Sequence, residues 1–164
     1  MTPDRDAPAS YNLLFVCTGN TCRSPLAEQI ARREVERRGW ANVEVGSAGA
    51  AAAEGTPASP EAARIAARNG LSLESHRSRP LTPELAAWAD LVLGMGPSHV
   101  YAAAEWVAAE KVAMLGDFAE GEQGRGEPVP DPFGGDESGY LEAYDTLSRM
   151  VSASLDRLAP ILNP

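Results

Sequence analysis

Hydrophobic residues occur along this chain in two arrangements, as short continuous runs and as positions spaced three or four apart. Continuous runs are typical of strands buried on both faces, whereas the wider spacing is typical of helices with one buried face. The runs predict strands at residues 11–16, 43–47, 90–95 and 111–115. The spacing and the Pro and Gly signals predict helices from Pro25 to Gly39, from after Thr56 to Arg68, from Thr82, from Pro97, and over residues 141–158. Residues 116–135, rich in Gly, Pro and acids, are predicted to form one long loop.

This alternation of strands and helices predicts a single α/β domain over residues 11–164, preceded by a flexible N-terminal segment at residues 1–10. The expected architecture is an open, twisted, four-stranded parallel sheet with helices on both faces. Ligands bind such sheets at the carboxyl ends of the strands. The turn after the first strand, which begins at Cys17, is therefore the first candidate for a functional site.

That turn has the sequence Cys17-Thr18-Gly19-Asn20-Thr21-Cys22-Arg23-Ser24-Pro25. Backbone N–H groups and a helix N-terminus converge on an anion in such a turn. These groups favour the thiolate, which is the form of cysteine that attacks, so Cys17 is the predicted nucleophile. Arg23 presents a planar fork that matches two phosphoryl oxygens. The sequence therefore predicts a phosphate-binding loop directly after the first strand.

The remaining loop residues fit this prediction. Gly19 and Asn20 tolerate tight-turn conformations, and the Asn20 side chain can tie the loop to itself. Ser24 can donate its hydroxyl to the sulfur, and Pro25 is expected at the first position of the helix. A buried, unreactive cysteine is the simpler alternative, but it does not explain the glycine, serine and proline together. Nucleotide hydrolysis is disfavoured because the usual Gly-Lys-Ser/Thr cradle is absent.

Breaking a phosphorus–oxygen or phosphorus–nitrogen bond also requires an acid that protonates the leaving group. Asp131 is the best candidate, because Pro130 and Pro132 restrict the backbone on either side of it. Taken alone, an ordinary loop aspartate is the simpler reading of this residue. The competing carboxylates are expected to be solvated: Asp117, Glu127 and Asp136.

The segment Val16–Pro25 resembles the signature of the low-molecular-weight protein tyrosine phosphatases, and Asp131-Pro132-Phe133 resembles the Asp-Pro loop of that family. The resemblance spans about residues 11–160 and includes Ser47-Ala48-Gly49 and the segment around His76. Within the family, the Thr-Gly-Asn-Thr loop and the Asp-Pro-Phe-Gly-Gly sequence are most similar to the bacterial protein arginine phosphatases. Tyrosine-specific relatives usually carry a bulkier apolar residue in place of Thr21 and a tyrosine pair in place of Phe133-Gly134.

The resemblance supports the general-acid role of Asp131 and implies further roles. Substrate contacts are expected from Thr18, Gly19, Asn20, Thr21, Cys22, Ser24 and Phe133. His76 is implied to brace Asn20 and Ser24 from outside the substrate cleft, and Ser47 to pack beneath the loop. Phe133 forms either a wall of the cleft or an anchor of its loop. Cys22 is either a small inward-facing residue or a resolving thiol that traps oxidised Cys17 as a disulfide, and the resemblance favours the second.

Composition limits the partners. The net charge of −9 argues against nucleic acid as the main partner. No apolar run approaches the roughly 20 residues that span a bilayer, and the first residues lack a signal-peptide pattern. Two cysteines within one loop do not form a disulfide framework of the secreted kind. We therefore expect a cytoplasmic protein with no membrane partner, no metal and no other cofactor.

Together these residues predict a cysteine-dependent phosphatase of phosphorylated proteins or peptides. Attack by Cys17 gives a cysteinyl-phosphate, and water activated by Asp131 releases inorganic phosphate. Phosphoarginine is the expected preferred substrate, and phosphotyrosine is the alternative. A thioredoxin-linked arsenate reductase is less favoured because its relay uses two cysteines besides the nucleophile, whereas this chain has only Cys22. A non-catalytic phosphoprotein-binding module would lack the nucleophile or the acid.

Overall fold

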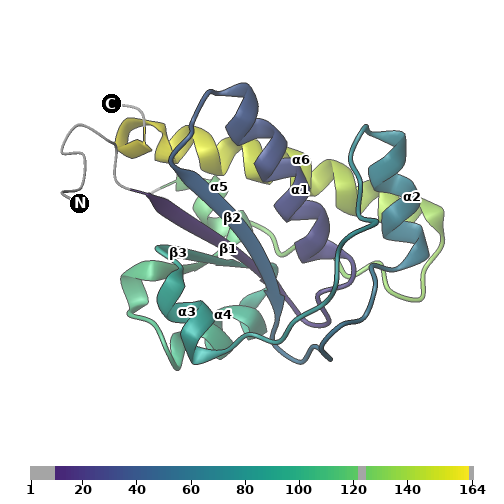
Figure 1. The fold of residues 1–164 in the computed structure, drawn as a ribbon, viewed down its shortest axis with the longest axis horizontal. Helices are drawn as coiled ribbons and strands as arrows, with labels where there is room; N and C mark the ends of the chain where they lie inside the picture. The colour runs from purple at the N-terminus through teal and green to yellow at the C-terminus, as the bar shows by residue number, and fades with distance from the viewer. Residues whose placement is uncertain (1–9, 122–124, 163–164) are drawn as a thin grey trace, which may run out of the picture.

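A computed structural model describes residues 10–121 and 125–162, and a four-stranded sheet lies between its helices (Figure 1). The strands pair in parallel, in the order β2-β1-β3-β4. They are β1 (Tyr11–Cys17), β2 (Val43–Gly49), β3 (Leu91–Gly94) and β4 (Val112–Met114). The predicted fold class is therefore confirmed. Residues 1–9, most of the expected flexible segment, lie outside the described residues.

Helices cover both faces of the sheet (Figure 1). One face is covered by α1 (Arg23–Arg37), α2 (Pro60–Arg68), α5 (Leu115–Ala119) and the long α6 (Glu137–Leu162). The other face carries α3 (Pro83–Trp88) and α4 (Pro97–Ala104). A short 3₁₀ turn, η1 (Ala109–Lys111), leads into β4.

The central strand β1 contributes to the core on each face. Leu13 and Phe15 pack on the side of α1 and α6, and Leu14 and Val16 pack on the side of α3 and α4. Successive side chains of a strand point to opposite faces, so burial on both faces accounts for the uninterrupted apolar run. Cys17 continues the phase of Leu13 and Phe15 and belongs to the same core cluster. The strand thus delivers its last side chain to the side where α1 begins.

Two expectations from the sequence need correction, and the first concerns the start of α1. The helix begins at Arg23, so Pro25 occupies the third helical position rather than the first. The first intrahelical acceptor is the Cys22 carbonyl, which accepts from Leu26 N at 3.1 Å. The opening N–H groups of a helix have no intrahelical partner, so proline is tolerated throughout the first turn.

The second correction concerns residues 116–135, which are not a single loop. Their first part belongs to α5, whose Leu115 is fully buried in the core. Asp117 Oδ1 then accepts a hydrogen bond from Gly126 N at 2.8 Å, so this carboxylate is not merely solvated as expected. Val129 is buried, and its N–H donates to Met95 O at 2.8 Å. These contacts direct the chain from α5 back toward the carboxyl end of β1. Residues 122–124 of the predicted loop lie outside the described residues.

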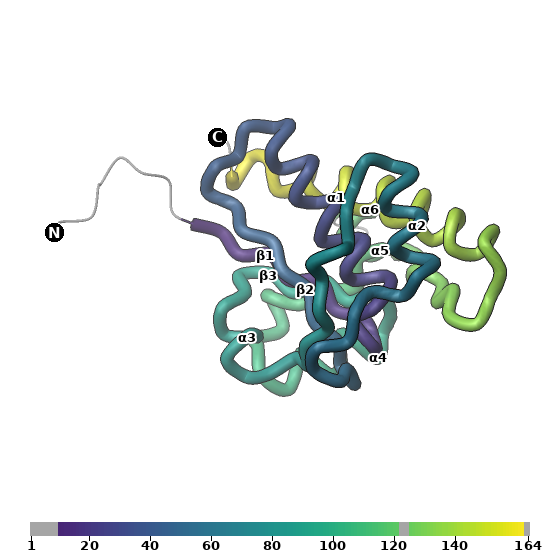
Figure 2. Tube along the Cα trace, turned by 45° about the vertical axis from the view of Figure 1, so that its right-hand side comes forward, coloured from purple at the N-terminus to yellow at the C-terminus, as the bar shows by residue number. Residues whose placement is uncertain are grey.

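The two ends of the described chain, at β1 and α6, lie on one side of the molecule in both views (Figure 1; Figure 2). The turn that follows β1 is at the opposite end of the sheet, away from both termini. Over residues 10–121 and 125–162, no helix combines the length and the apolar character needed to cross a bilayer.

Candidate active site

The loop after β1 forms a closed turn around the Cys17 thiol. Cys17 is 3% exposed, and its Sγ lies 2.9 Å from Ser24 Oγ at the start of α1. Asn20 Nδ2 donates to the same Ser24 oxygen at 2.8 Å, so the Ser24 hydrogen points away from Asn20, toward either Cys17 Sγ or the more distant Ala48 O at 3.4 Å. A hydroxyl donor at this distance stabilises a negative charge on Cys17 Sγ.

Asn20 holds the loop in shape from behind. Its φ of 56° lies in the left-handed region, which asparagine tolerates better than most residues. The fully buried side chain also donates to Ser47 Oγ at 3.0 Å and accepts from Arg79 N at 3.0 Å. His76 Nε2 donates to the Asn20 carbonyl at 2.7 Å. His76 therefore reaches Asn20 directly and Ser24 only through it.

The end of β2 packs directly beneath this loop. A side chain at Gly49 would collide with the Thr18 carbonyl and approach Asn20 N, so only glycine fits there. The carbonyls of Cys17 and Thr18 accept from Ala50 N at 2.8 Å and Ala51 N at 2.9 Å. In the described part of the chain, the N–H groups of residues 19–22 have no acceptor. The loop is thus anchored through carbonyls and side chains, and its amides remain available to an anion.

Arg23 connects the loop to the segment that carries Asp131. Its side chain is almost buried, and Nη1 donates to Val129 O at 3.1 Å. Nη2 lies 3.5 Å from Asp131 Oδ2, although the Asp131 side chain is 53% exposed. The nucleophile and the candidate acid are far apart in the sequence, but both line one cavity together with Arg23.

These groups surround a cavity of about 240 Å³. Its lining consists of Cys17, Thr18, Gly19, Thr21, Cys22, Arg23, Asp131 and Phe133. Of the expected contact residues, Asn20 and Ser24 lie behind the loop rather than on the cavity surface. Phe133 lines the cavity while 83% exposed, which favours a wall of the cleft over a loop anchor. Its backbone N–H donates to Asp131 Oδ1 at 3.1 Å, which helps to orient the carboxylate.

The two cysteines differ in their surroundings. Burial and the adjacent Cys17 raise the pKa of Cys22 to about 12, with Arg23 opposing the shift. Cys22 is therefore a neutral thiol at neutral pH. This leaves Cys17, with its Ser24 donor, as the candidate nucleophile of the pair.

Sequence reasoning missed His99, which follows β3 in the first turn of α4. Its Nε2 lies 2.9 Å from Thr18 Oγ1, and its Nδ1 lies 2.9 Å from Gly96 N. Burial, and secondarily the Arg23 charge, lower the pKa of His99 to about 4. The only signal in the sequence was its position just after a strand end, and recognising it required knowing that β3 lies beside β1.

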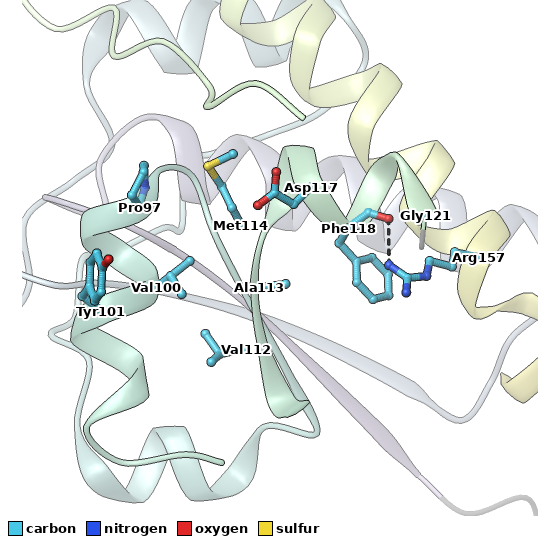
Figure 3. A pocket seen from close by; sticks show the side chains of 10 residues that line it. All are labelled: Pro97, Val100, Tyr101, Val112, Ala113, Met114, Asp117, Phe118, Gly121 and Arg157. Carbon is cyan, nitrogen blue, oxygen red and sulfur yellow. Dashed lines mark hydrogen bonds between the residues drawn. The ribbon is translucent and has the colours of Figure 1, made fainter. Parts of the chain in front are cut away.

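A second hollow, of about 590 Å³, lies between α4, β4, α5 and α6 and has no cysteine in its lining (Figure 3). Its lining is mainly apolar, and its two charged residues are Asp117 and Arg157. Arg157 is engaged by Phe118, donating to the backbone carbonyl at 3.2 Å with its guanidinium 4.2 Å from the ring centroid. No group of three or more His, Cys, Asp or Glu side chains suited to a metal ion occurs among the residues that the structure describes.

A buried thiol with a hydroxyl donor, loop amides without an acceptor and an arginine beside a carboxylate together suit the binding of a phosphoryl group and its attack by sulfur. The family model described as "Low molecular weight phosphotyrosine protein phosphatase" matches residues 12–160. The chain belongs to this family, as its sequence indicated.

The chain is similar both to protein arginine phosphatases and to protein tyrosine phosphatases. A protein-arginine-phosphatase of Geobacillus stearothermophilus is 40% identical over 151 residues, covering 91% of this chain and 94% of the relative. The low molecular weight protein-tyrosine-phosphatase Etp of Escherichia coli K12 is 34% identical, covering 90% and 95%. A solved structure of the YwlE arginine phosphatase, a mutant "with phosphorylated active site serine", has a TM-score of 0.81 and 36% identity, covering 90% and 95%.

Proposed function

We propose that this protein is a protein arginine phosphatase that hydrolyses phosphoarginine in proteins or peptides through a cysteinyl-phosphate. The observation that carries the proposal is the shared cavity of Cys17, Arg23 and Asp131, with Thr21 on its wall. The similarity to a protein-arginine-phosphatase supports the substrate class. The proposed partners are phosphorylated proteins, and inorganic phosphate is the product.

In the first step, Cys17 Sγ attacks phosphorus in line with the departing nitrogen. The sulfur–phosphorus bond forms as the phosphorus–nitrogen bond breaks, and Asp131 gives its proton to the leaving guanidine. The N–H groups of the loop and the Arg23 guanidinium stabilise the charge on the equatorial oxygens. Arg23 is preoriented for this, because Val129 O already holds Nη1.

In the second step, a water molecule replaces the cysteine. Asp131, now ionised, takes a proton from the water, whose oxygen attacks phosphorus as the sulfur–phosphorus bond breaks. The thiolate returns to the Ser24 hydroxyl, 2.9 Å away. The structure of a relative with a phosphorylated serine in its active site supports a covalent intermediate at this position. The protein's own donors neutralise the phosphoryl group, so the mechanism uses no metal and full activity is expected in chelator.

The preference for phosphoarginine rests on the groups at the cavity mouth. Thr21 offers a hydroxyl and little bulk, where an isoleucine or leucine would offer an apolar surface to a tyrosine ring. The half-exposed Asp131 carboxylate can pair with a guanidinium as well as supply a proton. The alternative is a tyrosine phosphatase, which the exposed Phe133 ring and the Etp relative favour.

We also propose that Cys22 protects the nucleophile in an oxidising episode. Peroxide converts Cys17 to a sulfenic acid; Cys22 then attacks that sulfur, forming a disulfide and releasing water. Oxidation of Cys17 removes its negative charge, one of the causes that raise the pKa of Cys22. Loss of this charge lowers the pKa of Cys22, while burial, the larger cause, still raises it. Two cysteines that are reduced in the resting enzyme fit a reducing compartment, and we propose that the enzyme is cytoplasmic.

The experiment compares kcat/KM for a phosphoarginine peptide and a phosphotyrosine peptide of the same sequence context. A higher value for phosphoarginine supports the proposal, and a higher value for phosphotyrosine supports the alternative. Arsenate-dependent thiol consumption is measured in parallel, and its presence would favour an arsenate reductase. Tight binding of both peptides without turnover of either would indicate a non-catalytic binding module.

A further inference from the structure

His99 is buried at the edge of the cavity although it does not line it. It is 4% exposed, lies in the first turn of α4, and joins the turn after β3 to the loop after β1. Its two ring nitrogens each lie 2.9 Å from a polar partner, Gly96 N on one side and Thr18 Oγ1 on the other. The proposed mechanism gives this residue no role.

The two contacts fix the tautomer of the ring. A backbone N–H can only donate, so His99 Nδ1 accepts from Gly96 and carries no proton. In the neutral ring the proton then lies on Nε2, which donates to Thr18 Oγ1. Burial and the Arg23 charge, which lower the pKa of His99 to about 4, keep the ring neutral at physiological pH.

This tautomer also fixes what Thr18 can offer. Its hydroxyl oxygen uses one lone pair to accept from His99, so the hydroxyl hydrogen remains to be donated elsewhere. Thr18 is exposed and lines the cavity between Cys17 and Gly19, and within the described chain its hydroxyl has His99 as its one partner. The hydrogen is therefore available to a group inside the cavity.

We propose that His99 is a positioning residue that fixes the Thr18 hydroxyl as a hydrogen-bond donor to a phosphoryl oxygen of the bound substrate. This inference rests on the proposed phosphatase function. A guanidinium has no acceptor, so within a phosphoarginine side chain only the phosphoryl oxygens can receive this hydrogen. Both phosphoarginine and phosphotyrosine present those oxygens, so the contribution should be the same for the two substrates.

A double-mutant cycle tests the coupling between the two residues. Thr18→Val removes the hydroxyl but keeps the branched shape. His99→Asn places an acceptor near the position of Nδ1 for Gly96 and removes the donor to Thr18. We expect each variant to lower kcat/KM by about 10- to 100-fold on both substrates, the usual size for losing one hydrogen bond to a charged group. The double variant should lose little more than either single one, because both remove the same interaction.

His99→Gln is the matched control, because its terminal amide can reach the position of Nε2 and donate to Thr18. It should recover most of the activity that His99→Asn loses. Three outcomes would overturn the inference. The two losses could multiply in the double variant, Thr18→Val could show no loss, or the loss could be confined to one substrate. Thermal unfolding of all variants separates misfolding from loss of positioning.

Two further readouts do not depend on turnover. Calorimetric titration with inorganic phosphate should show weaker binding to Thr18→Val and His99→Asn than to wild type and His99→Gln. The nitrogen NMR shifts of His99 at pH 7 should report an unprotonated Nδ1 and a protonated Nε2; the opposite tautomer would contradict the argument. If phosphate binding and the His99 tautomer are as expected but wild type turns over neither substrate, the proposed function is refuted and the placement of Thr18 still stands.

Discussion

The loop after β1 and the loop that carries Asp131 meet at one cavity, yet they are held in different ways. Asn20 in the first loop is fully buried and hydrogen-bonded to Ser24, Ser47, Arg79 and His76. Asp131 in the second is half exposed, with one hydrogen bond from its own turn and an ion pair with Arg23. The first loop is preorganised, and the second is adjustable.

This difference matches what each loop is proposed to bind. The phosphoryl group is the same in every substrate, so donors fixed before binding act on it without reorganisation. The leaving group and the chain around it differ between substrates, and they meet the exposed Asp131 and Phe133. Substitutions in the two loops should therefore separate phosphate recognition from leaving-group chemistry.

The largest effect is expected from Cys17→Ser, which removes the nucleophile and leaves the cradle in place. Turnover should fall by several orders of magnitude, while inorganic phosphate still binds because the Asn20 network is intact. Steady-state assays and phosphate titration measure the two properties. Residual activity above about one hundredth of wild type would rule out covalent thiolate catalysis.

Asp131→Asn should impair both proton transfers proposed for Asp131, but only the transfer to the leaving group depends on the substrate. Loss of a general acid typically costs about 10²- to 10⁴-fold in rate. The loss should be large for phosphoarginine and phosphotyrosine peptides and smaller for para-nitrophenyl phosphate, whose leaving group departs without a proton. Parallel kcat/KM measurements, which report the step that forms the cysteinyl-phosphate, test this; an equal loss on all of these substrates would assign Asp131 a structural role through Arg23.

Oxidation tests whether Cys22 belongs to the chemistry of the first loop or only to its packing. Peroxide should inactivate both wild type and Cys22→Ser, but a reductant should restore only wild type, because a disulfide is reducible and an overoxidised thiol is not. Activity before peroxide, after peroxide and after reductant gives the recovered fraction. Equal recovery in the two proteins would leave Cys22 as a packing residue.

Stability, rather than turnover, should depend on pH through His99. Its folded-state pKa of about 4 lies below the ordinary value near 6.5, so the unfolded chain binds this proton more readily. The stability linked to His99 is complete above about pH 6.5 and is lost as the pH falls toward 4. The loss is at most about 3 kcal/mol, and solvent near the cavity reduces it.

Denaturant unfolding of wild type and His99→Asn from pH 7 to pH 4 isolates this contribution, because every other titrating group is common to both. As the pH falls, the unfolding free energy of wild type should decrease more than that of the variant. A difference that does not vary with pH would show that His99 is protonated as easily in the folded state as in the unfolded one.

Local patterns account for what the sequence predicted. The strand that ends at Cys17, the phosphate loop and the parallel sheet follow from one apolar run, one turn and the alternation of elements. The helix at Leu115–Ala119 was missed because its Gly and Asp are typical of loops, and burial of Leu115 outweighs that preference. His99 depends on which strands are neighbours, and no local pattern contains that information.

The account is tested most directly by measuring kcat/KM of wild type and Thr21→Ile on phosphoarginine and phosphotyrosine peptides. Thr21 lies on the cavity wall, where isoleucine would replace a hydroxyl with an apolar surface that suits a tyrosine ring. Wild type should prefer phosphoarginine, and the substitution should shift the ratio toward phosphotyrosine by at least tenfold, about 1.4 kcal/mol of transition-state binding. A wild type that prefers phosphotyrosine would contradict the arginine assignment, while the cysteine mechanism would still stand.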